Sequence, residues 1–282
     1  NTPLKNYIPK FYGIHKEGSQ ENIIMEDLTL GFKSPCMGDF KVGTRHYDIN
    51  ATEAKKKMIL DRQKGSTTES IGVRLTDAKI RRNGSVVEEW SRKQGFSFTY
   101  EQLEKAWSEF LPTQHLRDEI VKKLDELYTA FDETVQEHPG FRMYSSSIFI
   151  AYDGDDMSDQ SELRVSFIVL AHAHLNIANE GCDIDDEIFD DGVLQGISSL
   201  MNFEFKDVSK QKTKGIKNEN SEGIQFVDDI RPHKTIRLCI LNPGGLKCYK
   251  RGQKKHEAEA YTTLSNTPLI EFLPKLYKSE NN

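Results

Sequence analysis

Cysteine is scarce in this chain, and long apolar runs are absent. The 282 residues contain four cysteines and no CxxC pair, which argues against a zinc site or a disulfide framework and indicates a reducing compartment. No apolar run approaches the roughly 18 residues that a transmembrane helix needs. The first residues also lack the charged-then-apolar layout of a signal peptide. We therefore expect a cytoplasmic or nuclear protein without a membrane partner.

Basic residues are concentrated in one part of an otherwise acidic chain. The formal net charge is −6 at pH 7, but residues 41–64 are basic and residues 153–191 are strongly acidic. Such a basic region predicts a local anion site rather than a nucleic-acid-binding surface, so no nucleic-acid partner is expected. The alternative is a solvated helix face. The basic side chains are those of Lys41, Arg45, Lys55, Lys56, Lys57, Arg62 and Lys64.

Periodicity along the first 205 residues predicts a mixture of helices and short strands. Apolar residues at three- and four-residue spacing are typical of amphipathic helices, and Thr52 is a good N-cap for the first of them. Short apolar runs between turn residues are typical of strands. We predict helices over 52–63, 100–110, 113–137 and 193–203. We predict strands over 22–28, 39–42, 72–75, 78–80, 147–152 and 165–170.

Residues 206–223 differ in kind from the rest of the chain. They are polar, rich in lysine and without periodicity, so they predict a linker or flexible loop. Beyond them, two apolar runs flank Pro243-Gly244-Gly245, which predicts a hairpin, and a helix is expected over 256–264. We therefore divide the chain into residues 1–205, 206–223 and 224–282.

The string PCMGDFKVG at 35–43 resembles the PxxxDxKxG signature of the inositol polyphosphate kinases. In a strand, Asp39 and Lys41 would share one face because side chains alternate. An aspartate can orient or deprotonate an attacking hydroxyl, and a neighbouring lysine can stabilise phosphoryl charge. The resemblance thus implies catalytic roles for Asp39 and Lys41.

Three further segments follow the order of this family. The EDLT stretch at 26–29 resembles its hinge, where backbone groups read adenine. This implies ATP-binding roles for Glu26, Asp27 and Leu28, with Asp27 on the ribose. The strings TTESIGVR and YSSSIFIAYDG resemble two more family motifs, and the match is most similar to the inositol hexakisphosphate kinase branch.

The segments that begin the family's N-lobe resemble the C-terminal part of this chain. The tail offers a hairpin with Lys247, which would hold ATP phosphates, and a helix with Glu257 or Glu259, which would orient that lysine; Lys250 is the competing lysine. The strings NTPLKNYIPKFY at the start and NTPLIEFLPKLY near the end are identical at seven of twelve positions. This order fits a circular permutant or a window across a tandem array, and we favour tandem duplication. Either way the tail would complete an N-lobe, in cis or by segment exchange within a dimer.

One position of the family pattern is altered. The family's IDFAH-like motif, whose aspartate binds magnesium, matches IVLAH here, so that Val169 stands at the metal position. Valine offers no oxygen ligand. Two interpretations remain: an inactive pseudokinase that binds inositol phosphate, nucleotide or both, and a working kinase whose metal is held by Asp153, Asp155 or Asp156. The acidic turn is alternatively a solvated loop, and His172 is expected to be structural.

The resemblance as a whole implies an α+β, two-lobed fold of the ATP-grasp and protein-kinase-like kind, with an antiparallel N-lobe sheet and a larger mixed C-lobe. It implies transfer of the ATP γ-phosphoryl group to an inositol polyphosphate such as inositol hexakisphosphate, with ATP and Mg2+ as cofactors. Cations suit such a substrate because phosphates accept charge-assisted hydrogen bonds. The expected substrate-binding residues are Lys41, Arg45, Lys55, Lys56, Lys57 and Lys64.

Overall fold

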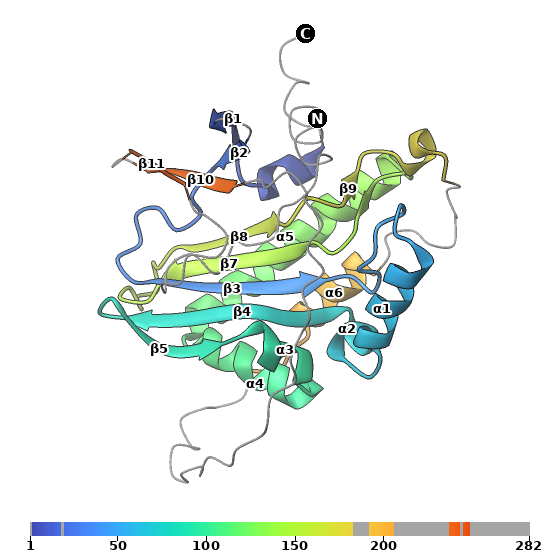
Figure 1. Ribbon diagram of the computed structural model, residues 1–282. Coiled ribbons are helices and arrows are strands. Elements are labelled where there is room, and N and C mark those ends of the chain that lie inside the picture. The colour runs from blue at the N-terminus through green and yellow to red at the C-terminus, as the bar shows by residue number, and fades with distance from the viewer. Residues whose placement is uncertain (1, 18–19, 183–191, 206–236, 243–244, 249–282) are drawn as a thin grey trace, which may run out of the picture.

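A five-stranded antiparallel sheet forms the centre of the molecule, with the strand order β5-β4-β3-β7-β8 (Figure 1). The strands are β3 (Pro35–Val42), β4 (Val73–Arg82), β5 (Ser85–Trp90), β7 (Ser147–Asp153) and β8 (Leu163–Ile168). This computed structural model describes residues 2–17, 20–182, 192–205, 237–242 and 245–248.

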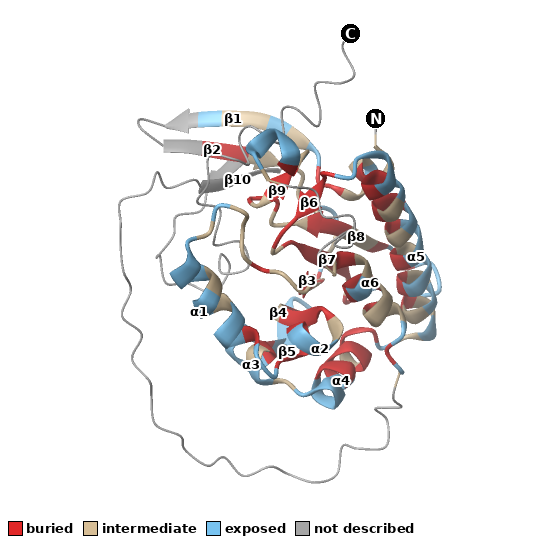
Figure 2. Ribbon diagram, turned by 90° about the vertical axis from the view of Figure 1, so that its right-hand side faces the viewer, coloured by how far each residue is buried: buried red, intermediate tan, exposed pale blue. Residues whose placement is uncertain are grey.

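Helices α4 (Tyr100–Phe110), α5 (Gln114–Glu137) and α6 (Val193–Met201) cover one face of this sheet. Phe40 of β3 packs edge-on against Trp107 and Phe110 of α4, with ring centroids 5.0 and 6.0 Å apart. The buried residues of α5 and α6 are turned toward the sheet (Figure 2). Because strand side chains alternate, Asp39 and Lys41 project from the opposite face to Phe40. The buried stripe of α5 is the one that periodicity predicts: Leu116, Ile120, Leu124, Leu127 and Phe131.

Three shorter helices lie between the strands in sequence: α1 (Glu53–Gln63), α2 (Thr67–Ile71) and α3 (Arg92–Ser97). The Thr52 hydroxyl accepts a hydrogen bond from the Lys55 amide and caps α1 as predicted. Most of α1 is exposed (Figure 2). α3 lies directly on β4, because a Cβ atom at Gly95 would come within 1.9 Å of the Leu75 carbonyl oxygen. Only glycine permits this approach.

A smaller sheet has the order β1-β2-β10-β11 and lies above the large sheet in Figure 1. Its strands are β1 (Phe11–Glu17), β2 (Gln20–Met25), β10 (Arg237–Asn242) and β11 (Gly245–Cys248). The pairs β1/β2 and β10/β11 are antiparallel, but β10 runs parallel to β2. Parallel neighbours need a long connection, and more than two hundred residues separate these strands. The expected antiparallel N-lobe sheet therefore has one parallel pairing.

Together the two sheets and their helices confirm the predicted two-lobed α+β fold. The remaining elements are short: η1 (Pro3–Tyr7), β6 (Arg142–Met143), β9 (Ala173–His174) and η2 (Ile177–Glu180). No helix in the described part of the chain is long and apolar enough to span a membrane.

The division into residues 1–205, 206–223 and 224–282 stays a prediction. The linker and most of the tail lie outside the described residues, including Glu257, Glu259 and Lys250. The backbone of Lys247 belongs to β11, but its side chain lies outside the described part.

Candidate functional site

The two signature residues of β3 lie in a buried, charged environment. Asp39 and Lys41 are each 8% exposed. Arg74, only 3% exposed, pairs in register with Lys41 from β4, and Ser147 pairs with Lys41 from β7. Three charges are thus brought together where β3 ends and where β4 and β7 begin. We call this region the Lys41 end of the sheet.

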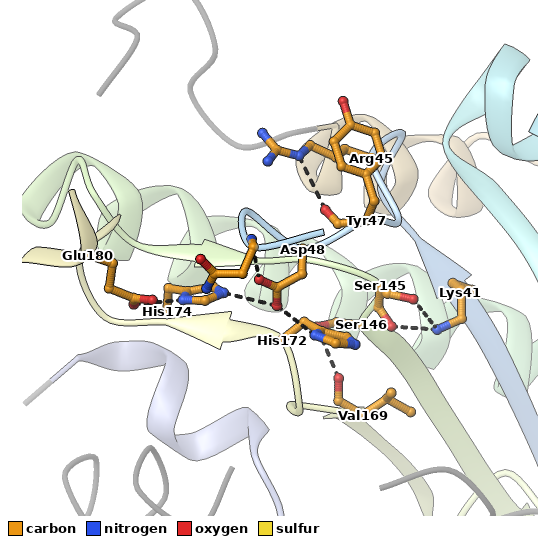
Figure 3. Close-up of polar contacts among 11 residues, drawn as sticks. Lys41, Arg45, Tyr47, Asp48, Ser145, Ser146, Val169, His172, His174 and Glu180 are labelled. Carbon is orange, nitrogen blue, oxygen red and sulfur yellow. Dashed lines mark hydrogen bonds and ion pairs between the residues drawn. The ribbon is translucent and has the colours of Figure 1, made fainter. Parts of the chain in front are cut away.

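Lys41 is held by backbone of unusual conformation (Figure 3). Its Nζ atom donates to the carbonyl oxygen of Ser145 and, at 3.1 Å, to the hydroxyl of Ser145. Ser145 and Val169 both have left-handed backbone, with φ of 56° and 60°. The Ser146 hydroxyl joins the two segments by donating to the Val169 carbonyl at 3.4 Å. Because a β-branched residue rarely adopts this conformation, which costs about 1–3 kcal/mol, the surroundings of Val169 must impose it, as is typical of functional sites.

Burial shifts the ionisation of the three charges at the Lys41 end. Burial raises the pKa of Asp39, although the charge of Lys41, a hydrogen bond from Ser147 and the charge of Arg74 oppose the shift. Burial lowers the pKa of Lys41 to about 8, despite the neighbouring Asp39. Burial, together with repulsion by Arg92, lowers the pKa of Arg74 to about 10. Asp39 Oδ1 has no hydrogen-bond partner among the described residues. An aspartate with a raised pKa and an unpaired oxygen is suited to accept a proton.

A chain of carboxylates and imidazoles borders this region (Figure 3). Asp48 Oδ2 lies 2.6 Å from His172 Nδ1 and 3.3 Å from His174 Nε2, and Glu180 Oε1 lies 2.7 Å from His174 Nδ1. Each nitrogen of His174 faces a carboxylate oxygen, an arrangement that favours the imidazolium form, in which both nitrogens donate. Burial opposes that charge, but Asp48 and Glu180 raise the pKa of His174. His172 is oriented by Asp48, which agrees with a structural role.

The residues of the expected hinge lie between β2 and β3. Asp27 Oδ1 accepts hydrogen bonds from the amide and hydroxyl of Thr29, at 2.8 and 2.7 Å, and so fixes a turn. Arg164 of β8 anchors the next residues by donating to the carbonyl oxygens of Leu28 and Leu30, at 3.1 and 2.8 Å. The Glu26 side chain accepts from the Lys10 amide. The hinge backbone is therefore anchored to both lobes.

The structure places Asp153 and Asp155 at the opposite end of the sheet from Val169. Asp153 is in register with Pro35, whereas Ser147 is in register with Lys41, about 20 Å away along the strand. Asp153 accepts from the amides of Lys33, Ser34 and Asp155, and Asp155 accepts from the Ser34 hydroxyl and the Asn83 amide. Both are occupied in fixing a turn. The interpretation that they replace a metal ligand at position 169 is therefore wrong.

Asp156 is also engaged locally, since it accepts from the amide and hydroxyl of Ser158. Within the described part of the chain, no group of three or more His, Cys, Asp or Glu side chains is arranged to hold a metal ion. The acidic run 183–191 lies outside that part. The described residues near Val169 thus do not fit a protein-held magnesium ion.

The expected substrate-binding cations are spread over α1 and the segment before it. Lys55, Lys57 and Lys64 are exposed, whereas Lys56 forms an ion pair of 2.7 Å with Glu53. Arg45 stacks on two rings, those of Tyr47 and Tyr144, at 4.6 and 4.4 Å. The structure therefore does not gather the α1 lysines into one buried site, and their role stays a prediction.

Several residues at the Lys41 end were not singled out from the sequence. Arg74 lies in the string TTESIGVR, so the motif could have identified it. Arg92 and Phe96 come from α3, and Asp48 and His174 come from loops or short strands. No local pattern marks these four residues, because their proximity to the site depends on tertiary packing.

Comparison with known proteins shows which protein family this chain resembles. A sequence model described as "Inositol polyphosphate kinase" matches residues 22–204. Inositol hexakisphosphate kinase 2 of Homo sapiens is 26% identical over 210 residues, which cover 65% of this chain and 49% of that protein. An uncharacterized inositol polyphosphate kinase of Schizosaccharomyces pombe is 30% identical over 160 residues, covering 50% of this chain and 16% of that protein. The chain thus spans about half the length of the human relative.

Among solved structures, the inositol phosphate multikinase of Saccharomyces cerevisiae, in complex with ADP and Mn2+, is similar with a TM-score of 0.57. The sequences are 23% identical, and the alignment covers 72% of this chain and 89% of that one. At this identity the likeness concerns the fold. Because the family model matches well over half of the residues, the chain belongs to the inositol polyphosphate kinase family.

Proposed function

We propose that this chain is an ATP-dependent inositol polyphosphate kinase, which transfers the γ-phosphoryl group of ATP to an inositol polyphosphate such as inositol hexakisphosphate. The observation that carries the proposal is the buried pair of Asp39 and Lys41. Both signature side chains stand on one strand, shielded from solvent, with a raised pKa for the acid and a lowered pKa for the base. Burying two charged side chains costs desolvation free energy, which a pair without a catalytic role would give no reason to retain.

Each member of the pair has a role that its environment supports. Asp39 would orient the attacking oxygen through Oδ1, which has no hydrogen-bond partner among the described residues. In a partly phosphorylated inositol that oxygen is a hydroxyl whose proton Asp39 would accept. In inositol hexakisphosphate, which has no free hydroxyl, it is a phosphate oxygen. Lys41 would stabilise negative charge on the transferred phosphoryl group, because its ammonium is fixed by Ser145 beside Asp39. The hinge backbone at Glu26–Leu28 would read adenine, and Asp27 would bind the ribose.

Magnesium would accompany ATP in such a reaction and would neutralise phosphate charge when bound. The described residues offer no carboxylate at position 169. A metal held by this chain would therefore need a ligand that these residues do not supply.

A second candidate function follows from the same position. A chain with Val169 at the metal position would bind an inositol phosphate, a nucleotide or both without catalysing transfer. The left-handed φ of Val169 favours this candidate, because it is a conformation that aspartate and asparagine tolerate and valine does not.

Transfer of label from γ-32P-ATP to inositol hexakisphosphate would separate the two candidates. The kinase proposal predicts labelled product with the intact chain and Mg2+, and none with Lys41→Ala. Thermal-shift titrations with each ligand would run in parallel, because a ligand that binds only the native state raises the melting temperature. Binding without label transfer would establish the inactive candidate, and absence of both would overturn the function.

The tail of the chain has a separate proposed role. We propose that the hairpin β10–β11 completes the N-lobe sheet beside β2, either within one chain or by exchange between two chains. The repeat shared by residues 1–12 and 266–277 supports an origin by tandem duplication. Sedimentation of the chain over a range of concentrations would distinguish a closed monomer from an exchanged dimer.

A further inference from the structure

The first described residues of the chain anchor its N-terminal end to the C-lobe. The short helix η1 packs against helix α5 and strand β8. Leu4 and Ile8 are 1% and 4% exposed, and both belong to the main hydrophobic core. We call the surface of α5 and β8 that η1 covers, which includes Glu126 and Ser166, the η1 face. Residues 2–12 thus bind to this face through buried apolar side chains.

Backbone atoms of the same segment make hydrogen bonds to the rest of the protein. The Ser166 hydroxyl donates to the carbonyl oxygen of Tyr7 at 2.9 Å. The Glu26 amide donates to the carbonyl oxygen of Lys10 at 2.8 Å, and the Lys10 amide donates to the Glu26 carboxylate at 3.1 Å. The Tyr7 hydroxyl adds one exposed contact of 3.4 Å with Glu126. Because every residue other than proline carries the same backbone groups, a second segment with the same apolar anchors can make the same backbone contacts.

Residues 266–277 repeat residues 1–12 most faithfully at the buried positions. The three buried residues of the first copy are identical or conservatively replaced in the second, as the pairs Leu4/Leu269, Ile8/Leu273 and Pro9/Pro274 show. The two non-conservative differences are Lys5/Ile270 and Asn6/Glu271, and they fall on half-buried and exposed positions of the first copy. The repeat therefore preserves the side chains that binding to the η1 face requires.

The strand order of the small sheet brings the tail within reach of this face. Strand β11 ends at Cys248 and lies three strands from β1, which is about 15 Å at the usual spacing of strands. Strand β1 begins at Phe11, so the anchored segment runs directly into it. Residues 249–265 can extend over about 55 Å at most. A tail that leaves β11 can therefore reach the η1 face of its own chain.

We propose that the η1 face is a docking site for residues 266–277 of the same chain, which compete there with residues 2–12. The competition does not depend on catalysis, so it stands apart from the proposed kinase activity. The two segments present leucine, a second aliphatic side chain and proline at the same spacing, and one face accepts only one of them at a time. Whichever segment is bound holds Glu26 of the expected hinge through the backbone of its lysine, Lys10 or Lys275.

A double-mutant cycle on the full chain tests this competition. Leu4→Ala and Leu269→Ala together should lower the melting temperature by about 10 °C, because neither segment keeps its leucine anchor. Leu4→Ala alone should lower it by less than half as much, because the tail then occupies the face. Leu269→Ala alone should cause no measurable shift, so the two effects are coupled rather than additive. Ile8→Val and Leu273→Val form a milder cycle, which should show coupling of the same sign.

A matched control and a free peptide identify the occupant. Glu271→Ala is the control within the tail, because Glu271 corresponds to the exposed Asn6. Added to Leu4→Ala, it should lower the melting temperature no further. A synthetic peptide of residues 266–277 should raise the melting temperature of the double alanine variant, because it binds the folded state. The same peptide with Leu269→Ala should not raise it.

Three results would overturn the proposal. Equal effects of Leu269→Ala with and without Leu4→Ala would exclude competition for one face. No stabilisation by the intact peptide would exclude residues 266–277 as the occupant. A melting temperature of the Leu4→Ala variant that rises with protein concentration would exclude the tail of the same chain and assign the η1 face to the tail of a second copy.

Discussion

The two ends of strand β3 are equally rich in charged and polar groups but differ in how these are satisfied. At the Pro35 end, Asp153 and Asp155 accept hydrogen bonds from surrounding amides and the Ser34 hydroxyl. At the Lys41 end, Asp39, Arg74 and His46 carry buried atoms without partners in the described structure. Ser145 and Val169 there have left-handed backbone. Asn83 at the Pro35 end has it too, but asparagine tolerates this conformation, whereas a β-branched valine rarely adopts it.

This difference identifies which end carries function. A satisfied polar network stabilises the fold and needs no ligand, whereas native proteins leave few buried polar groups unpaired. Unpaired groups and conformational strain in one place indicate that something else completes the site. The acidic turn, which the sequence offered as one alternative source of metal ligands, is occupied in fixing a turn. The Lys41 end is where we propose that phosphate binds.

The largest effect should come from Lys41→Met. Loss of a fixed cation at the phosphoryl group should lower turnover by about 100- to 1000-fold, measured with saturating ATP and inositol hexakisphosphate. Lys33→Met is the control at the other end, because its side chain is exposed beside Asp153. Equal losses in both variants would remove the distinction between the two ends.

Asp153→Ala should lower the stability of the fold without lowering turnover, the opposite of what we expect for Lys41→Met. The variant leaves the Lys33 and Ser34 amides without their acceptor, so the free energy of unfolding should fall by about 1–3 kcal/mol. Turnover of the folded protein should not change. Urea denaturation measures the first quantity, and a loss of turnover at full folding would contradict the assignment.

Val169→Asp and Val169→Asn test the left-handed position together. Both residues tolerate positive φ better than valine, so both should raise the free energy of unfolding by about 1 kcal/mol. Val169→Asp alone supplies a carboxylate and should increase magnesium-dependent transfer. An increase of the same size in Val169→Asn would attribute the gain to backbone relief.

The two ends should also respond oppositely to pH. The pKa of Lys41 is lowered from 10.5 to about 8, so between these values the unfolded chain binds more protons and the free energy of unfolding rises with pH. Activity should fall over the same interval as the cation is lost. Burial opposes ionisation of Asp153, but the hydrogen bonds from the Lys33, Asp155 and Ser34 amides together lower its pKa. Its stabilisation is therefore lost as pH falls through that lowered value. Lys41→Met should abolish the rise in the free energy of unfolding at alkaline pH. It should leave the loss of stability at acidic pH, which comes from Asp153, unchanged.

Local patterns predicted the four longer helices α1, α4, α5 and α6 but not the short helices α2 and α3. The stripe of α5 repeats every three or four residues, and Thr52 and Thr113 cap their helices through side-chain hydrogen bonds. The segments 72–75 and 78–80, predicted as two strands, form the single strand β4. Strand β4 continues through the polar Thr76-Asp77 step by a bulge: Asp77 pairs with Asp39 and Leu75 with Phe40, so Thr76 is the extra residue. Periodicity alone read this step as a break.

The site was predictable only where a motif is contiguous in sequence. Asp39 and Lys41 are two residues apart on one strand, so their spacing identified them. Arg92 and Phe96 reach the site from α3 and Asp48 reaches it from a loop. Strand β5, with five exposed residues in six, has no apolar pattern that would predict it. Asp153 and Asp155 have the composition of a metal site, but their partners are backbone amides that no sequence pattern displays.

One crossed experiment tests the central claim that the Lys41 end binds phosphate and the Pro35 end stabilises the fold. Melting temperatures of the intact chain, Lys41→Met and Asp153→Ala would be measured with and without inositol hexakisphosphate. We predict that Asp153→Ala melts at a lower temperature but keeps the full ligand-induced rise. We predict that Lys41→Met loses most of that rise without losing stability. A full rise in Lys41→Met, or a rise abolished in Asp153→Ala, would contradict the account.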